Sequence, residues 1–271
     1  MMSAPPTSVC DWFASPLGRA LLVREQIAVR QALGDVFGAY LLQVGSWGAS
    51  DAFLAFARTQ RSALLAEPGG QGDLMSHASA LAVSTASVDG LLLPHTLEFE
   101  PEPHAVLREA ERVLVGEGHL IIVGFAPGSP WDLAHRLWPA SLPPGMTRLW
   151  SARRVTDWLE VLGFEVQSVH PYLGLWPSQR LVDSSVSLAM EGVAGRVGAL
   201  TRPGSRLAQY PWPLAGAYLL KARKRLYTLT RVVRTRRRAA RLSTAMARPV
   251  ARISESCPLG AVRDESSRHE Q

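Results

Sequence analysis

The segment Asp89–Phe125, DGLLLPHTLEFEPEPHAVLREAERVLVGEGHLIIVGF, determines the predicted fold. Its unbroken apolar run up to Leu93 predicts a strand that is buried on both faces. Pro103 suits the first position of a helix, and apolar residues at helical spacing continue until Gly116. Residues 119–125 then form a second apolar run. A strand, a helix and a strand in this order indicate one unit of a parallel sheet.

The same alternation extends over the rest of the chain. Strands are predicted at 40–45, 62–67, 72–76, 165–173 and 215–224, helices at 18–37, 49–60, 132–137 and 151–163, and helical or irregular structure at 178–208. We therefore predict an α/β protein with a doubly wound, mostly parallel, Rossmann-like sheet of seven strands. Ligands bind outside the carboxyl ends of such strands, so His95 is expected to face the ligand crevice.

Composition and cysteine content narrow the class of protein. The 271 residues are 47% hydrophobic, which is enough for one full core. Cys10 and Cys257 lie near opposite ends, so we predict no disulfide framework and no metal site. The N-terminus lacks the pattern of a signal peptide, and no apolar run approaches the ~20 residues of a transmembrane helix. These features predict a soluble, cytoplasmic protein.

Positive charge is concentrated near the C-terminus. The formal net charge is +6, but residues 221–252 contain twelve Lys or Arg and no acid, so the remainder is acidic. Such density favours nucleic acid or an anionic membrane surface as a partner for residues 225–252. The alternative is a disordered, solubilising tail at 225–271. Between Arg231 and Arg252, no aromatic residues are interleaved for base stacking.

A glycine turn and an acid follow the first two predicted strands. Gly45 and Gly48 come directly after the strand at 40–45, where glycine lets the backbone approach a ligand closely. Glu67 ends the next strand, 22 positions after Gly45. An acid at such a place can accept hydrogen bonds from ribose hydroxyls. The alternative for Glu67 is a solvated side chain before a turn.

The segment 87–125, SVDGLLLPHTLEFEPEPHAVLREAERVLVGEGHLIIVGF, resembles the region around the fourth and fifth strands of class I S-adenosylmethionine-dependent methyltransferases. The most similar branch is methyltransferase type 11, which includes enzymes of ubiquinone and menaquinone biosynthesis. The resemblance is close over about 37 residues and looser over 40–170. It implies S-adenosyl-L-methionine as cofactor and an acceptor that is a small molecule. It also implies a methyltransferase domain at 38–224 beneath an N-terminal helical cap at 1–37.

The resemblance also implies where the cofactor binds. Gly45 and Gly48 would form the turn under its methionine part, and Glu67 would hold the ribose. His77 and Ala78 would lie beside the adenine.

Further along the chain, Leu93, Pro94 and His95 would lie near the sulfonium and its methyl group. His95 is the candidate catalytic base, because an imidazole can take a proton from the acceptor. Alternatively, His95 orders the loop by hydrogen-bonding backbone groups, and the reaction proceeds without a base. Three tryptophans lie in loop-like sequence, namely Trp131, Trp138 and Trp150. We expect them either to line the acceptor site or to pack in the core.

Some positions depart from the family pattern. Gln43 replaces an acid, and it can still hydrogen-bond the amino group of the cofactor but without a charge. Trp47 and Ala49 replace glycines, so that an indole would crowd the cofactor unless the turn is rebuilt. His77 also replaces an acid. An alternative function follows, in which a catalytically degenerate methyltransferase fold binds nucleic acid or an anionic surface through its tail.

Overall fold

A seven-stranded sheet forms the centre of the computed structural model, which describes residues 8–48, 52–137, 141–172 and 215–226. The strands are β1 (Tyr40–Val44), β2 (Arg61–Ala66), β3 (Leu74–Met75), β4 (Val88–Pro94), β5 (Leu114–Phe125), β6 (Phe164–Tyr172) and β7 (Ala217–Lys224). The helices are α1 (Val9–Ala14), α2 (Pro16–Ala32), α3 (Thr96–Phe99), α4 (Pro103–Val113), α5 (Pro130–Leu137) and α6 (Ala152–Val161), with 3-10 turns η1 (Leu33–Asp35) and η2 (Leu54–Phe56).

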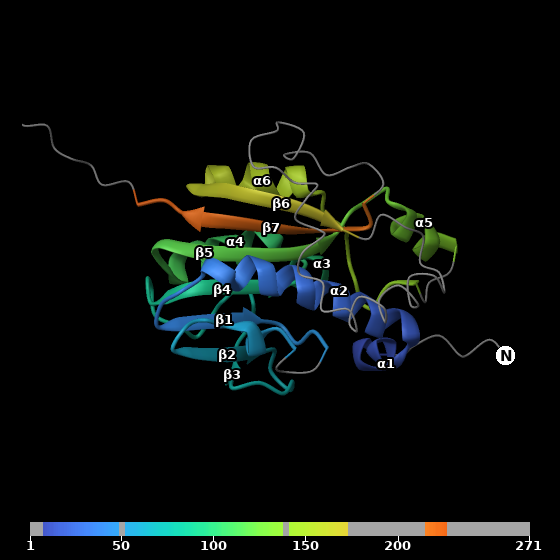
Figure 1. Ribbon diagram of the computed structural model, residues 1–271, viewed down its shortest axis with the longest axis horizontal. Coiled ribbons are helices and arrows are strands. Elements are labelled where there is room, and N and C mark those ends of the chain that lie inside the picture. The colour runs from blue at the N-terminus through green and yellow to red at the C-terminus, as the bar shows by residue number, and fades with distance from the viewer. Residues whose placement is uncertain (1–7, 49–51, 138–140, 173–214, 227–271) are drawn as a thin grey trace, which may run out of the picture. The chain divides into compact units, whose positions relative to one another are not determined.

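The strands are arranged in the order β3-β2-β1-β4-β5-β7-β6 (Figure 1). Neighbours among the first five are parallel, and β7 runs antiparallel between β5 and β6. The strand order reverses at β1 and β4, so the carboxyl ends of these two strands mark the place where a doubly wound sheet binds ligands. The predicted doubly wound, mostly parallel, Rossmann-like sheet is confirmed.

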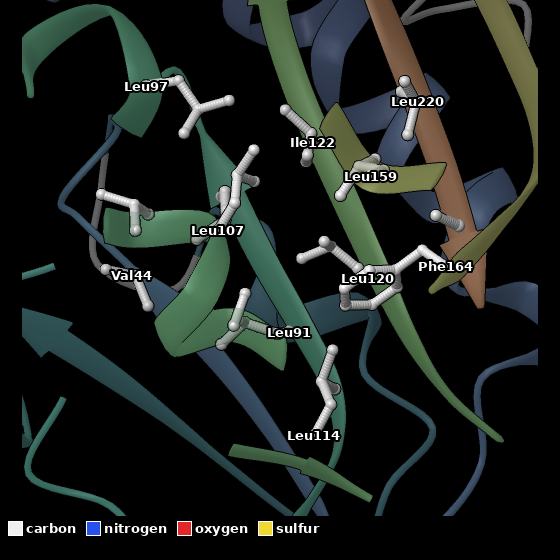
Figure 2. Close-up of a cluster of buried hydrophobic side chains, with 14 of the residues drawn as sticks. Val44, Leu91, Leu97, Leu107, Leu114, Leu120, Ile122, Leu159, Phe164 and Leu220 are labelled. Carbon is white, nitrogen blue, oxygen red and sulfur yellow. The ribbon is translucent and has the colours of Figure 1, made fainter. Parts of the chain in front are cut away.

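Helices cover both faces of the sheet because successive side chains of its central strands point to opposite sides. Leu91 and Leu93 of β4 belong to a cluster with residues of α4 and α6 (Figure 2). Leu92 belongs to a second cluster with Trp12 of α1 and Leu21 of α2. Figure 1 shows α2 lying across one face of the sheet. The unbroken apolar run in β4 is thereby explained, since each of its faces is buried.

Local sequence signals set most of the helix ends. Pro103 is at the start of α4, as predicted. Ser15 and Ser151 cap α2 and α6, and the side chain of each accepts a hydrogen bond from a backbone N–H three residues later. The helix α4 ends at Val113 rather than Gly116, because β5 begins directly at Leu114.

The predicted helix at 49–60 is wrong for its described part, residues 52–60, which contain the 3-10 turn η2. The backbone N–H groups of Gln60 and Arg61 already donate to Gly38 and Ala39 at the start of β1. This pairing fixes the start of β2 and commits residues 60 and 61 to the sheet, so the predicted helix could not extend to residue 60. The predictions for 178–208, and for the tail beyond residue 226, lie outside the described residues. Within the described ranges, no helix has both the length and the apolarity that crossing a membrane requires.

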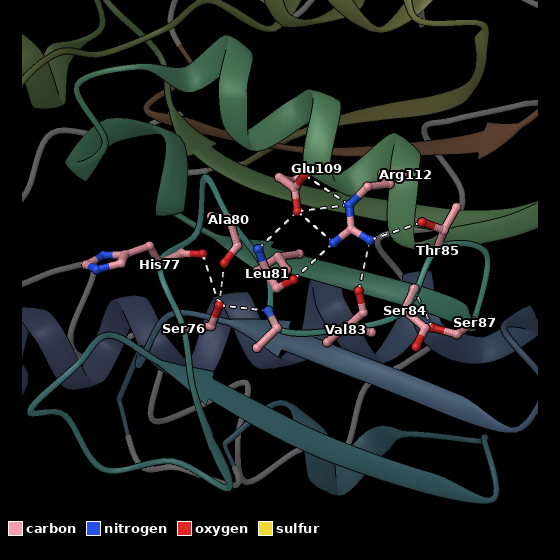
Figure 3. A network of polar contacts seen from close by, with 11 residues as sticks. Ser76, His77, Ala80, Leu81, Val83, Ser84, Thr85, Ser87, Glu109 and Arg112 are labelled. Atoms are coloured by element: carbon pink, nitrogen blue, oxygen red, sulfur yellow. Dashed lines mark hydrogen bonds and ion pairs between the residues drawn. The ribbon is translucent and has the colours of Figure 1, made fainter.

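The guanidinium of Arg112 connects α4 to the segment between β3 and β4 (Figure 3). It donates to the backbone oxygens of Leu81 and Val83 at 3.0 and 2.9 Å and pairs with Glu109 at 2.8 Å. Glu109 in turn accepts a hydrogen bond from the N–H of Leu81. Ser76 closes the same segment by donating to the oxygen of Ala80 at 2.6 Å. These bonds hold residues 76–83 on the surface of α4.

Replacing this guanidinium tests its role. We expect Arg112→Ala to lower the free energy of unfolding by about 1–3 kcal/mol, because two carbonyls and one carboxylate lose their donor. Urea denaturation measures the change. Arg108→Ala, on the exposed side of the same helix, is the matched control and should change it by less than about 0.5 kcal/mol. Equal losses in both variants would contradict the structural role of Arg112.

Candidate functional site

A cavity of about 600 Å³ opens at the carboxyl ends of β1, β2 and β4. It is lined by Val9, Val44, Gly45, Ser46, Trp47, Leu65, Glu67, Ser76, His77, Ala78, Ser79, Thr96, Phe99, Glu100 and Pro101. Four of the predicted site residues, Gly45, Glu67, His77 and Ala78, therefore lie around one cavity. They come from the ends of β1 and β2 and from the segment that Arg112 holds in place.

The turn after β1 is shaped by Gly45 and by the residues around it. Gly45 has a φ of +93°, which glycine adopts without strain, and its N–H donates to the oxygen of Leu65 at 2.9 Å. The hydroxyl of Thr96 donates to the oxygen of Val44 at 2.7 Å. The turn is thus fastened to β2 and to α3, and its backbone forms one wall of the cavity.

Gln43 supports this turn and does not line the cavity. Its side chain is fully buried, and Nε2 donates to the oxygen of Gly45 at 3.0 Å. Its Oε1 has no hydrogen-bond partner within the part of the chain that the structure describes. In this arrangement the amide acts on the ligand site only through the backbone of the turn.

Gly48, Leu93 and Pro94 also lie outside the cavity lining. Gly48 has a φ of +73°, and a Cβ at this position would lie 2.8 Å from a methyl carbon of Leu22 in α2. The positive φ therefore favours glycine at this position, since the side chain of Leu22 could move away from a Cβ. Leu93 and Pro94 are buried at the end of β4. The structure does not bring these three residues together with Gly45 and Glu67.

Glu67 shares the cavity with a second carboxylate, Glu100, which follows α3. Partial burial and then the hydrogen bond and negative charge of Glu67 raise the pKa of Glu100 above its ordinary value, while His77 partly offsets this effect. The free site therefore holds two acids that compete for charge. A cationic ligand would relieve their repulsion.

His95 is placed differently from the expectation that it faces the ligand crevice, and that expectation was wrong. Its side chain is completely buried, and Nε2 lies 2.8 Å from Oε1 of Glu25 in α2. Its Nδ1 lies 3.6 Å from Oε1 of Glu98. The indole of Trp47 stacks on the imidazole, with ring centroids 4.1 Å apart. His95 has left-handed backbone angles, with a φ of +55°, which aim its side chain under the turn instead of out of it.

The charge state of His95 follows from these neighbours. Burial alone would lower its pKa, but the charges and hydrogen bonds of Glu25 and Glu98 outweigh burial and raise the pKa to about 9. At neutral pH the ring is therefore an imidazolium between two carboxylates. An imidazolium cannot accept a proton, and this one does not reach the cavity. We therefore do not assign proton transfer to His95.

Trp47 does not block the site, because its indole is turned onto His95 and is only 1% exposed. Its Nε1–H donates to Oε2 of Glu25 at 2.5 Å, and the ring edge contacts Phe13. Glu25 also accepts a hydrogen bond from the hydroxyl of Tyr172, at 3.3 Å. The turn is thus rebuilt around the indole, which forms part of the wall beside the cavity.

Sequence reasoning missed several lining residues, among them Thr96, Phe99 and Glu100. Their signal was the acidic, proline-marked stretch that follows β4. The position of this stretch past a strand end places it at the ligand edge of the sheet. Val9 was missed because no local pattern in α1 predicts that it borders a ligand.

The buried imidazolium predicts how stability depends on pH. Since the pKa of His95 rises from 6.5 in the unfolded chain to about 9, its contribution is complete below pH 6.5 and is lost as pH increases through 9. We expect a loss of about 3 kcal/mol over this range, measured by urea unfolding from pH 6 to 10.

Two further measurements make this prediction specific to His95. Its ring signals in nuclear magnetic resonance should titrate near pH 9. His104→Gln, which alters an exposed histidine on α4, should leave the pH profile unchanged. A His95 ring that titrates near pH 6.5 would refute the ion cluster.

Comparisons with known proteins agree with this geometry. Residues 43–122 match a family model described as a methyltransferase domain. The chain is 35% identical to the uncharacterized protein YafS of Escherichia coli over 133 residues, which cover 48% of this chain and 55% of YafS. It is 33% identical to the uncharacterized protein Rv2003c of Mycobacterium tuberculosis over 164 residues, which cover 57% of this chain and 56% of that protein. The chain thus matches about half the length of these curated relatives.

Among solved structures, the fold is similar to that of an S-adenosylmethionine-dependent methyltransferase from Thermotoga maritima. The TM-score is 0.53 at 17% identity, and the similarity covers 79% of this chain and 97% of the other. At this identity the similarity shows the fold. The family model adds the assignment of residues 43–122 to a methyltransferase domain. Together, the two comparisons confirm the resemblance to class I S-adenosylmethionine-dependent methyltransferases.

Proposed function

We propose that this class I methyltransferase domain binds S-adenosylmethionine in the 600 Å³ cavity and transfers its methyl group to a small-molecule acceptor. One observation carries the proposal. A glycine turn, a carboxylate and the His77–Ala78 segment surround a single cavity at the carboxyl ends of β1 and β2, inside the matched region. That volume lies within the range of ordinary small-molecule sites.

The chain's own residues fit the cofactor. In this proposal Glu67 accepts hydrogen bonds from the ribose hydroxyls, and Gly45 lets the backbone approach the methionine part closely. His77 and Ala78 border the adenine. Gln43 acts indirectly, since it fixes the oxygen of Gly45 and leaves no charge at the cavity wall.

Charge complementarity supports the same ligand. Because Gln43 is neutral and faces away, the negative charge of the cavity comes from Glu67 and Glu100. S-adenosylmethionine carries a net positive charge, and a nearby cation favours the ionised form of both acids. When bound, the cofactor supplies a methyl group on a sulfonium that is already activated for transfer. The protein then needs mainly to position the acceptor, which is consistent with a site in which His95 is not a base.

The N-terminal helices take part in this proposal as a cap, residues 1–37. Val9 lines the cavity, and Glu25 holds Trp47 against His95. The methyltransferase domain itself is proposed to span 38–224. A role for residues 225–252 in binding nucleic acid or an anionic membrane surface stays a prediction from the sequence, because the structure describes this part of the chain only up to residue 226.

A carboxylate variant tests the cofactor site. We expect Glu67→Gln to weaken binding of S-adenosylmethionine and S-adenosylhomocysteine by about 10- to 100-fold, because charge-assisted hydrogen bonds to the ribose are lost. The melting temperature should not fall, since the substitution also removes repulsion between Glu67 and Glu100. Titration calorimetry and thermal unfolding provide the two measurements.

Glu160→Gln, on the exposed side of α6 and outside the cavity, is the matched control and should bind both ligands as the wild type does. A folded wild-type protein that binds neither ligand would refute the proposed function. Unchanged affinity in Glu67→Gln would refute only the role of Glu67.

A further inference from the structure

A second hollow, of about 350 Å³, lies past the carboxyl end of β5 and beside the start of α6. Its charged lining residues are Arg136, Arg148, Arg154 and Asp132. Three guanidinium groups thus face one carboxylate, which leaves the hollow positively charged. None of the residues that line it also lines the larger cavity.

The indole of Trp150 forms a fixed wall of this hollow. Its Nε1–H donates to the oxygen of Leu97 in α3 at 3.2 Å, and its ring meets the edge of Trp158 with centroids 4.9 Å apart. The guanidinium carbons of Arg148 and Arg154 lie 4.5 and 5.7 Å from the centroid of the same ring. Stacking on an anchored aromatic ring restricts both cations while their N–H edges stay available for hydrogen bonds.

Arg136 differs from the other two arginines because it has an acidic partner. It pairs with Asp132 at 3.2 Å, and Asp132 also accepts the N–H of Gly128. For Arg148 and Arg154, the described ranges contain no ion pair with an acid. Two cations are therefore held close to one ring without a counterion, in a concave site. Guanidinium groups of this kind can donate paired N–H groups to a carboxylate or a phosphate.

We propose that this hollow binds an oxyanion group, a carboxylate or a phosphate, carried by the methyl acceptor. The proposal rests on the proposed function and names the substrate class. Helix α3 lies between the two sites, since Thr96 and Phe99 line the larger cavity while the oxygen of Leu97 bonds to Trp150. The oxyanion held by Arg148 and Arg154 thus lies on the flank of α3 away from the cofactor site, so the acceptor has to extend past α3 for its methyl-accepting atom to reach the cofactor. The small volume suits one anionic group better than a nucleic-acid strand.

Nuclear magnetic resonance of the full-length protein tests the anion site. Side-chain N–H signals of Arg148, Arg154 and Trp150 are followed while sodium phosphate or sodium acetate replaces sodium chloride at constant ionic strength. We expect saturable shifts with at least one of the two anions, and the better one identifies the group. Arg154→Ala should weaken that binding about tenfold or more. Arg153→Ala removes the same charge from the adjacent, exposed position outside the hollow and should have no effect.

Several outcomes would overturn the anion site. Linear, unsaturated shifts with both anions would do so, as would equal effects of Arg153→Ala and Arg154→Ala. Binding of single-stranded RNA through Arg148 and Arg154, with no saturation by either anion, would replace the small-anion site by a nucleic-acid surface. S-adenosylhomocysteine affinity, measured in the same proteins, should be equal in wild type and Arg154→Ala. If none of these proteins bound S-adenosylhomocysteine, the proposed function would be refuted. The phosphate or acetate titration would still decide whether the hollow binds an anion.

The assignment of this anion to the acceptor has its own test. A small-molecule extract is incubated with the protein and with S-adenosylmethionine labelled in its methyl group. We expect a labelled product that anion-exchange resin retains, formed by wild type and Arg153→Ala and reduced at least about tenfold in Arg154→Ala. A neutral or cationic product, or one formed equally by Arg154→Ala, would overturn the assignment.

Discussion

The buried ion cluster of Glu25, His95 and Glu98 is the constraint on which the ligand edge depends. It joins α2, the end of β4 and α3 in a volume without solvent. A buried charge that loses its partner costs about 3–5 kcal/mol, so the three elements are held in one arrangement. Trp47 covers the cluster, and its bond to Glu25 fixes the turn that begins at Gly45. The wall of the cavity is therefore held in place by charged side chains that do not line it.

The acidic groups of this chain lie at other positions than in the methyltransferase family, where acids are usual at the positions of Gln43 and His77. The residue at the end of β1 is Gln43, which holds the turn from within, while the carboxylates at the cavity are Glu67 and Glu100. Because Gln43 is an amide, this buried position adds no further negative charge to an interior that already contains Glu25 and Glu98. The acids that could meet a cation are instead close to solvent, where their ionisation costs less. The cavity and the two carboxylates thus lie at the same edge of the sheet.

Much of the fold could be predicted from the sequence because its signals are local. Continuous apolar runs specified the buried strands, and Pro103 and Ser151 specified helix starts. The residues at strand ends, such as Glu67, followed from the topology of a parallel sheet. The direction of His95 could not be predicted, since it depends on its backbone angle and on Glu25, which is 70 residues away. The orientation of Trp47 could not be predicted either, because it stacks on His95 and donates a hydrogen bond to Glu25, both distant in sequence. The irregular structure at 52–60 likewise accompanies distant backbone hydrogen bonds, from Gln60 and Arg61 to residues before β1.

The contact between Glu25 and His95 also bears on how the chain can be divided. The region that matches the methyltransferase family begins at residue 43, well after Glu25. A fragment or chimera cut at that border would retain the imidazolium and one carboxylate but lose the other, together with the acceptor for the Trp47 indole. The first helices are therefore not a detachable module. Any transplant of this ligand site onto another scaffold has to carry α2 with it.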